Sequence, residues 1–192
     1  MISDDQPPPS RAAERAGTAF VLAGGGSLGA IQVGMLTELI SSGVHPSMII
    51  GVSAGALNGA FLAHDPSAET VDRMAGLWSR ISTREVLGLS WRSVLGLLGF
   101  RDHVANPQGL KNLLERELPY RVFSQTAIPL YLVCTELITG EEVVISEGNV
   151  IEAILASTAV PGVFPPVLHK GRLLVDGAVC ANMPQMRFPN AH

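Results

Sequence analysis

The sequence has few groups that could hold the chain together through covalent bonds or metal ions. It contains only two cysteines, Cys134 and Cys180, and both lie in apolar segments. Such a pair is typical of buried thiols in a reducing compartment and argues against a disulfide framework or a metal site. A chain of 192 residues buries roughly 70% of its unfolded surface, so it needs neither to form a core. We expect no structural metal.

Positive charge and long apolar runs are also scarce. Thirteen lysines and arginines stand against 17 acidic residues, so the basic field that nucleic acid binding requires is missing. No stretch reaches the ~18 apolar residues of a transmembrane helix. Residues 1–17 lack the basic start and the apolar centre of a signal peptide. We therefore expect a cytoplasmic protein that is either soluble or peripheral to a membrane.

The apolar runs that are present alternate between short and long. Residues 18–23 and 47–52 have the length and apolarity of buried strands, and each leads through a tight turn into a helical segment, at 28–42 and at 54–63. The helix at 28–42 is apolar on nearly every side, which predicts that it is buried on most sides. Strands that alternate with helices favour an α/β fold.

This pattern continues without an internal repeat or a second linker, which predicts one domain over residues 18–184. Residues 1–17, with three prolines and no apolar run, are expected to form a disordered leader. Residues 185–192 show no pattern and are expected to form a tail.

The second predicted strand leads into a G-x-S-x-G motif. Ser53 lies between Gly51 and Gly55, with an apolar strand before the motif and a helix of small residues after it. This is the setting of a nucleophile elbow, in which a strained strand-to-helix turn exposes the serine. The alternative is a tight glycine turn whose serine caps the helix.

The first predicted strand leads into a glycine-rich loop, Gly24-Gly25-Gly26-Ser27-Leu28-Gly29. Successive backbone N–H groups at a helix N-terminus can bind an anion. The loop also fits the dinucleotide fingerprint, but residues 44–50 contain no acidic side chain for the ribose. An oxyanion hole beside a nucleophile accounts for both glycine motifs, and we favour it.

A serine nucleophile needs a general base, and the five histidines have no persuasive setting. His103, in the sequence Arg-Asp-His, is retained as an alternative base. Asp176 has a clearer position, because the apolar strand 172–175 delivers it into a turn with Gly177. Open α/β sheets place their sites at the carboxyl ends of strands. Asp176 is therefore a candidate base for Ser53, although an aspartate there can equally cap the next turn.

Together, residues 23–34, 51–60 and 175–184 resemble the patatin-like phospholipase family, whose glycine-rich loop, G-x-S-x-G and D-G-[GA] blocks come in that order. The resemblance implies a three-layer α/β/α sandwich around a mainly parallel sheet. Family domains continue past the Asn-x-Pro block with another helix and strand, whereas this chain ends eight residues after Pro184. We therefore expect a sheet that lacks this last helix and strand.

The resemblance also implies a Ser-Asp dyad that hydrolyses lipid acyl esters without histidine, metal or cofactor. Ser53 is then the nucleophile and Asp176 the group that takes its proton. Backbone donors to the oxyanion come from Gly24, Gly25 and Gly26, and further glycines support the motifs, namely Gly29, Gly51, Gly55 and Gly177. Many members have Arg or Lys where this chain has Leu28, so we expect oxyanion stabilisation by backbone dipoles alone.

Residues 87–100 form an apolar segment with two interpretations. Its spacing fits a helix that is either a lid touching a lipid interface or part of the core. The main prediction is a lipid acyl hydrolase. Its rivals are a lipid acyltransferase that uses the same dyad and a non-catalytic lipid- or nucleotide-binding domain.

Overall fold

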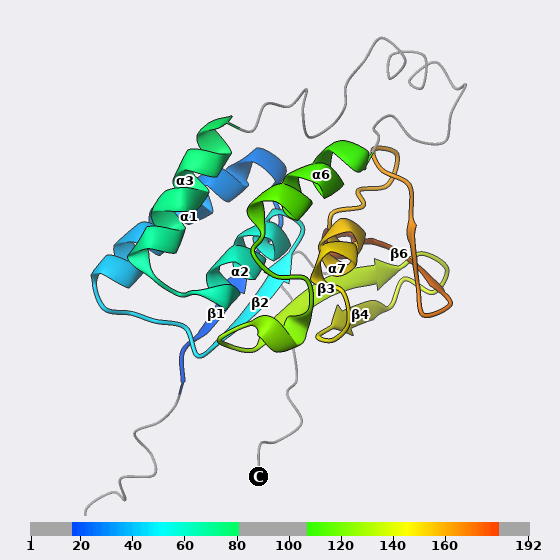
Figure 1. Cartoon of the computed structure of the whole chain (residues 1–192). Helices are drawn as coiled ribbons and strands as arrows, with labels where there is room; N and C mark the ends of the chain where they lie inside the picture. The colour runs from blue at the N-terminus through cyan, green and yellow to red at the C-terminus, as the bar shows by residue number, and fades with distance from the viewer. Residues whose placement is uncertain (1–16, 81–106, 181–192) are drawn as a thin grey trace, which may run out of the picture.

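The structure, a computed structural model, describes residues 17–80 and 107–180 and contains one mixed sheet (Figure 1). The segment 87–100, His103, the predicted tail and all but Gly17 of the predicted leader lie outside the described residues. The six strands are β1 (Ala19–Leu22), β2 (Met48–Val52), β3 (Leu130–Glu136), β4 (Glu142–Ile145), β5 (Val167–His169) and β6 (Arg172–Asp176).

The first three strands run parallel and the others antiparallel. Leu22 of β1 pairs with Gly51 of β2, and Val52 of β2 pairs with Val133 of β3. The strands β4 and β6 are both antiparallel to β3, and β5 is antiparallel to β6. The α/β fold class predicted from the alternation of strands and helices is confirmed.

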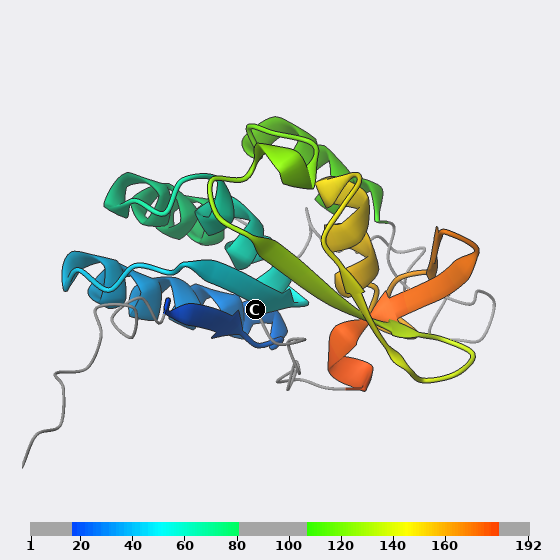
Figure 2. The same cartoon turned by 90° about the horizontal axis from the view of Figure 1, so that it is seen from below.

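The α-helices among the described residues pack on one face of this sheet. Parallel crossovers are right-handed, so the connections from β1 to β2 and from β2 to β3 put their helices on the same side. In Figure 2, α3 and α6 both lie above the strands β2 and β3. Side chains from all five α-helices share one buried cluster with Phe20, Ile49 and Leu132. The helices are α1 (Gly29–Ser41), α2 (Ala54–His64), α3 (Ala68–Arg80), α6 (Gln108–Glu117) and α7 (Val150–Ser157).

The opposite face of the sheet forms a separate small cluster of Ile50, Val52 and Val133, against which Tyr131 packs. None of the described helices contributes to this cluster. Residues 17–80 and 107–180 therefore provide two layers of the expected sandwich, the sheet and one layer of helices. No helix in this part of the chain is long and apolar enough to cross a membrane.

The prediction that the first helix is buried on most sides is wrong. Within α1, Val33, Leu36 and Ile40 are buried, whereas Ile31 and Met35 are each 61% exposed. The two sets lie on opposite sides of the helix, because residues three or four apart share a face. The buried side packs mainly against α3 and α2. Nothing in the described chain covers the other side, so an apolar stripe is left on the surface.

Candidate active site

The sheet contains a junction where two strands meet end to end. Residues 132 and 133 of β3 pair with both β2 and β4, so these strands lie on opposite edges of β3. Residues 134 and 135 pair with both β4 and β6, so β6 lies on the edge that β2 also occupies. Val52, the last residue of β2, pairs with Val133, and Asp176, the last residue of β6, pairs with Cys134. Ser53 and Asp176 thus meet at the junction.

Ser53 occupies a strained turn between β2 and α2. Its φ of 52° and ψ of −118° are unusual for a residue with a side chain. Its backbone N–H donates to Ser157 Oγ at 3.0 Å, and Ser157 in turn donates to the Val133 carbonyl at 2.7 Å. The Ser53 side chain makes no capping hydrogen bond with α2. This argues against the alternative of a serine that merely caps the helix and agrees with a nucleophile elbow.

Asp176 uses its two carboxyl oxygens differently. Oδ1 accepts a hydrogen bond from the Ala178 N–H at 2.8 Å and so caps the short 3₁₀ turn η5 (Gly177–Val179). Oδ2 is buried and has no hydrogen-bond partner in the described chain. Only 2% of the residue is exposed. Asp176 therefore caps a turn, as one of its two sequence interpretations predicted, and its second oxygen has no partner, which is compatible with the other interpretation.

Burial raises the pKa of Asp176, because a desolvated carboxylate is disfavoured in its charged form. The Ser53 hydroxyl and the Ala178 N–H act in the opposite direction by stabilising the charge, and burial outweighs them. The Ser53 hydroxyl is therefore near enough to influence the carboxyl. The two groups nevertheless form no hydrogen bond with each other through Oδ2, which remains without a partner in the described chain.

The glycine-rich loop connects β1 to the short 3₁₀ turn η2 (Gly26–Leu28) and then to α1. Gly26 has a φ of +56°, which a residue with a side chain rarely adopts. In the described chain, the backbone N–H groups of Gly24 and Gly25 donate to no backbone carbonyl. They remain available to an anion.

The four glycines predicted to support the motifs lie at close contacts between segments. A Cβ at Gly55 would lie 2.0 Å from the Leu22 carbonyl oxygen, which no real contact allows. This contact brings the nucleophile turn against the end of β1, where the glycine-rich loop begins. The other three glycines are equally confined, Gly29 by Trp78 at 2.4 Å, Gly51 by the Gly55 carbonyl at 2.6 Å and Gly177 by the Val133 carbonyl at 2.3 Å.

The sequence reasoning missed two residues near the site, Ala54 and Ser157. Ala54 follows Ser53, and its N–H begins α2 without a backbone acceptor in the described chain. In nucleophile elbows this N–H contributes to the oxyanion hole, so the motif itself could have indicated Ala54. Ser157 had no comparable signal, because its role depends on α7 packing beside the turn.

The two cysteines differ in burial, so the prediction of two buried thiols is wrong for one of them. Cys134 is buried beside Asp176 in the sheet, and this burial raises the pKa of its thiol. Cys180 is exposed because it follows η5 where the chain leaves the sheet. No group of three or more His, Cys, Asp or Glu side chains among the described residues could hold a metal ion.

The three described histidines lie away from the junction. His64 is the last residue of α2, whereas Ser53 precedes its first, so about 15 Å of helix separates them. Its ring stacks on Tyr120. His45 and His169 have no hydrogen bond to Ser53 or Asp176. Of the predicted bases in the described chain, only Asp176 lies beside Ser53, where β2 and β6 meet on β3.

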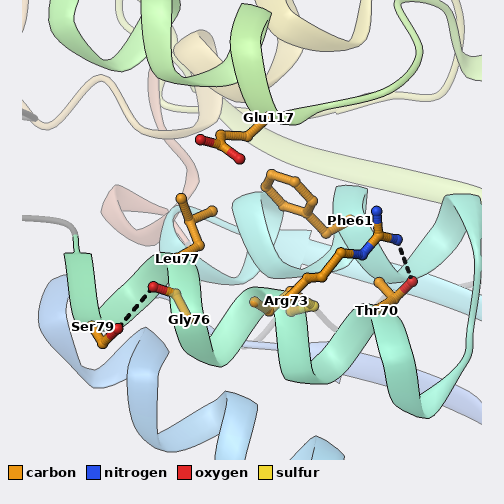
Figure 3. A pocket seen from close by; sticks show the side chains of 8 residues that line it. Phe61, Thr70, Arg73, Gly76, Leu77, Ser79 and Glu117 are labelled. Atoms are coloured by element: carbon orange, nitrogen blue, oxygen red, sulfur yellow. Dashed lines mark hydrogen bonds between the residues drawn. The ribbon is translucent and has the colours of Figure 1, made fainter.

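A cavity of about 450 Å³ lies apart from this junction, between α2, α3 and α6 (Figure 3). Phe61, Arg73, Leu77 and Glu117 line it, and Arg73 donates a hydrogen bond to Thr70. None of the predicted site residues contributes to its wall. We therefore assign no catalytic role to this cavity.

Comparison with known proteins confirms the resemblance to a known family. The sequence model described as "Patatin-like phospholipase" matches residues 20–188. The chain belongs to the patatin-like phospholipase family. The relatives of this patatin-like chain include one named as an esterase and one named as a phospholipase domain-containing protein.

These relatives match 86% of the patatin-like chain. An uncharacterised NTE family protein of Mycobacterium bovis is 33% identical over 168 residues. Patatin-like phospholipase domain-containing protein 7 of Rattus norvegicus and neuropathy target esterase sws of Drosophila sechellia are each 28% identical. The chain spans 27% of the first relative and 12% and 11% of the others.

A solved structure has the same fold. VipD from Legionella pneumophila superposes with a TM-score of 0.65 at 16% sequence identity, and the match covers 91% of this chain and 48% of VipD. At this identity the likeness concerns the fold. It supports the assignment of a mixed, patatin-like sheet.

Proposed function

We propose that this chain hydrolyses carboxylic esters of lipids through a dyad of Ser53 and Asp176. One observation carries the proposal, namely a buried carboxyl oxygen without a hydrogen-bond partner next to a serine in a strained strand-to-helix turn. Buried polar atoms normally have partners, and an exception invites a functional explanation. A serine hydroxyl that donates its proton during reaction would provide that partner.

In the proposed acylation step, Asp176 Oδ2 accepts the proton of Ser53 Oγ while Oγ attacks the ester carbonyl carbon. The carbonyl oxygen becomes an oxyanion. The tetrahedral intermediate then collapses, the bond to the leaving alcohol breaks, and Asp176 returns the proton to that alcohol. An ester suits this dyad better than an amide, because an alkoxide demands less help from an acid to leave.

In the proposed deacylation step, water attacks the acyl-enzyme and Asp176 takes one of its protons. The second tetrahedral intermediate releases the carboxylic acid, and the proton returns to Ser53 Oγ. The raised pKa of Asp176 favours both steps, since a carboxylate becomes a stronger base as its pKa approaches the working pH.

The oxyanion is proposed to bind the N–H groups of Gly24 and Gly25 together with that of Ala54. These groups lack backbone acceptors among the described residues, and Ala54 stands at the positive end of the α2 dipole. Gly26 belongs to the same loop and completes the predicted set. In other serine hydrolases the removal of one oxyanion donor costs about 10²- to 10³-fold in kcat.

The test compares ester hydrolysis by three variants of the whole chain. The substrates are a p-nitrophenyl ester and lysophosphatidylcholine. With both, the kcat of Asp176→Asn should fall about 10²- to 10⁴-fold, because the general base is removed. His103→Ala should keep its activity, because the dyad needs no histidine. Asp65→Asn is the matched control, as Asp65 lies beyond the far end of α2. Retained turnover in Asp176→Asn with loss in His103→Ala would overturn the proposal.

A further inference from the structure

A chain of polar side chains connects three helices to the base of the glycine-rich loop. Trp78 Nε1 on α3 donates to Asn58 Oδ1 on α2 at 2.8 Å. Asn58 Nδ2 donates to Gln32 Oε1 on α1 at 3.0 Å, and to the Gly29 carbonyl at 2.9 Å. Gln32 Nε2 donates to the Ala23 carbonyl at 2.6 Å. The chain of donors therefore ends on the residue that precedes Gly24.

The direction of this chain is fixed by chemistry. The indole of Trp78 is only a donor, so the atom of Asn58 that faces it must be the amide oxygen. Asn58 therefore presents its NH₂ group to Gln32, whose oxygen must accept, which leaves the Gln32 NH₂ group for the Ala23 carbonyl. Asn58 is 1% exposed, and a buried amide in such a position is costly unless its groups are satisfied. The network thus has one consistent orientation.

The last hydrogen bond acts on the Ala23–Gly24 peptide. The described chain contains no cis peptide bond, so the carbonyl of Ala23 and the N–H of Gly24 point to opposite sides of one plane. A donor that holds the carbonyl also holds the direction of the N–H. The Ala23 carbonyl is confined from another side too, because a Cβ at Gly55 would come within 2.8 Å of its oxygen.

We infer that Trp78, Asn58 and Gln32 form a positioning network that sets the direction of the Gly24 N–H in the oxyanion hole. This inference rests on the proposed function, because it assigns the network to the loop that would hold the oxyanion. Gln32 is a positioning residue, since it acts through the backbone and touches no reacting atom. The contact of the Trp78 ring with Gly29 holds α3 against the start of α1.

The test replaces Gln32 by side chains of similar size without the donor. Gln32→Met removes both hydrogen bonds, and Gln32→Glu keeps the shape but turns an oxygen toward the Ala23 carbonyl. Both variants should lose roughly 10- to 100-fold in kcat with KM changed less than threefold, because a misaligned donor fails mainly in the transition state. The affinity for a trifluoromethyl ketone, which forms a tetrahedral oxyanion adduct, should fall in parallel with kcat.

Further readouts separate positioning from a general loss of structure. The acid limb of the pH profile, which reports the base, should stay where it is in the Gln32 variants. Gln125→Met is the matched control, since Gln125 accepts two backbone N–H groups near η4 (Phe123–Gln125) and should leave kcat unchanged. Trp78→Phe, which removes the N–H and keeps a ring, should reduce kcat in the same direction as Gln32→Met, and it carries the test if Gln32→Met does not fold.

Two results would contradict the inference. A third result would contradict the proposed function on which the inference rests. Gln32→Met with kcat within twofold of wild type contradicts the positioning role. So does a loss of activity without a parallel loss of affinity for the ketone. If instead Ser53→Ala retains full activity, the proposed dyad itself fails.

Discussion

At the scale of single residues, Asp176 shows how a buried carboxyl group can reduce stability. Its pKa is raised by burial, so the folded state binds the proton more tightly than the unfolded state does. The stability that Asp176 contributes is fully present below the ordinary pKa of 3.8 and is lost as the pH rises through the raised value. At neutral pH the buried charge therefore opposes folding.

Asp176→Asn should accordingly melt at the same temperature as the wild type or higher at neutral pH. The asparagine keeps an oxygen for the Ala178 N–H and removes the buried charge. The difference in melting temperature between the variant and the wild type should shrink toward zero as the pH falls below 4, where the wild-type carboxyl is also neutral. Thermal unfolding followed by circular dichroism between pH 3.5 and 8 measures this. A gain that grows on acidification would contradict it.

Asp65→Asn should affect stability in the opposite direction at neutral pH. Asp65 accepts hydrogen bonds from Ser67 and Thr70 before α3, and chiefly the bond from Ser67 lowers the pKa of Asp65. Its stabilisation is present above the ordinary pKa of 3.8 and disappears as the pH falls through the lowered value. This variant should therefore lose stability at neutral pH and approach the wild type in acid.

At the scale of secondary-structure elements, α1 shows where sequence reasoning reaches its limit. Its apolar residues correctly indicate a helix, and both βα units were predictable from their short apolar strands. A helix that is apolar on two sides does not reveal which side is covered. In the described chain α1 packs against α2 and α3 on one side only, and this depends on the tertiary arrangement.

The two sides of α1 should respond differently to truncation. Leu36→Ala removes a side chain that is 1% exposed and should cost about 2 to 5 kcal/mol of unfolding free energy. Met35→Ala, at the neighbouring and 61% exposed position, should change it by less than about 0.5 kcal/mol. Both variants introduce alanine into the same helix, so helix propensity has little effect on the comparison. Urea unfolding measures the difference, and equal losses would contradict the observed burial.

At the scale of the whole molecule, the candidate site depends on strand register as well as on motifs. The three glycine motifs predicted Ser53, Asp176 and the loop residues, because each motif is local. Nothing local indicates that β2 and β6 meet end to end on β3, and that junction brings Ser53 and Asp176 together. The network from Trp78 to Gln32 was equally hidden, since its members are ordinary residues of three different helices.

The proposed function depends most on Ser53 being an activated nucleophile. Its most direct test is to treat the whole chain with a fluorophosphonate and to measure the intact mass, with Ser53→Ala and Asp176→Asn in parallel. We expect one adduct on the wild type, none on Ser53→Ala and much slower labelling of Asp176→Asn. The reason is that the probe reacts with a serine that loses its proton to a base. An unlabelled wild type, or a Ser53→Ala variant labelled as fast as the wild type, would contradict it.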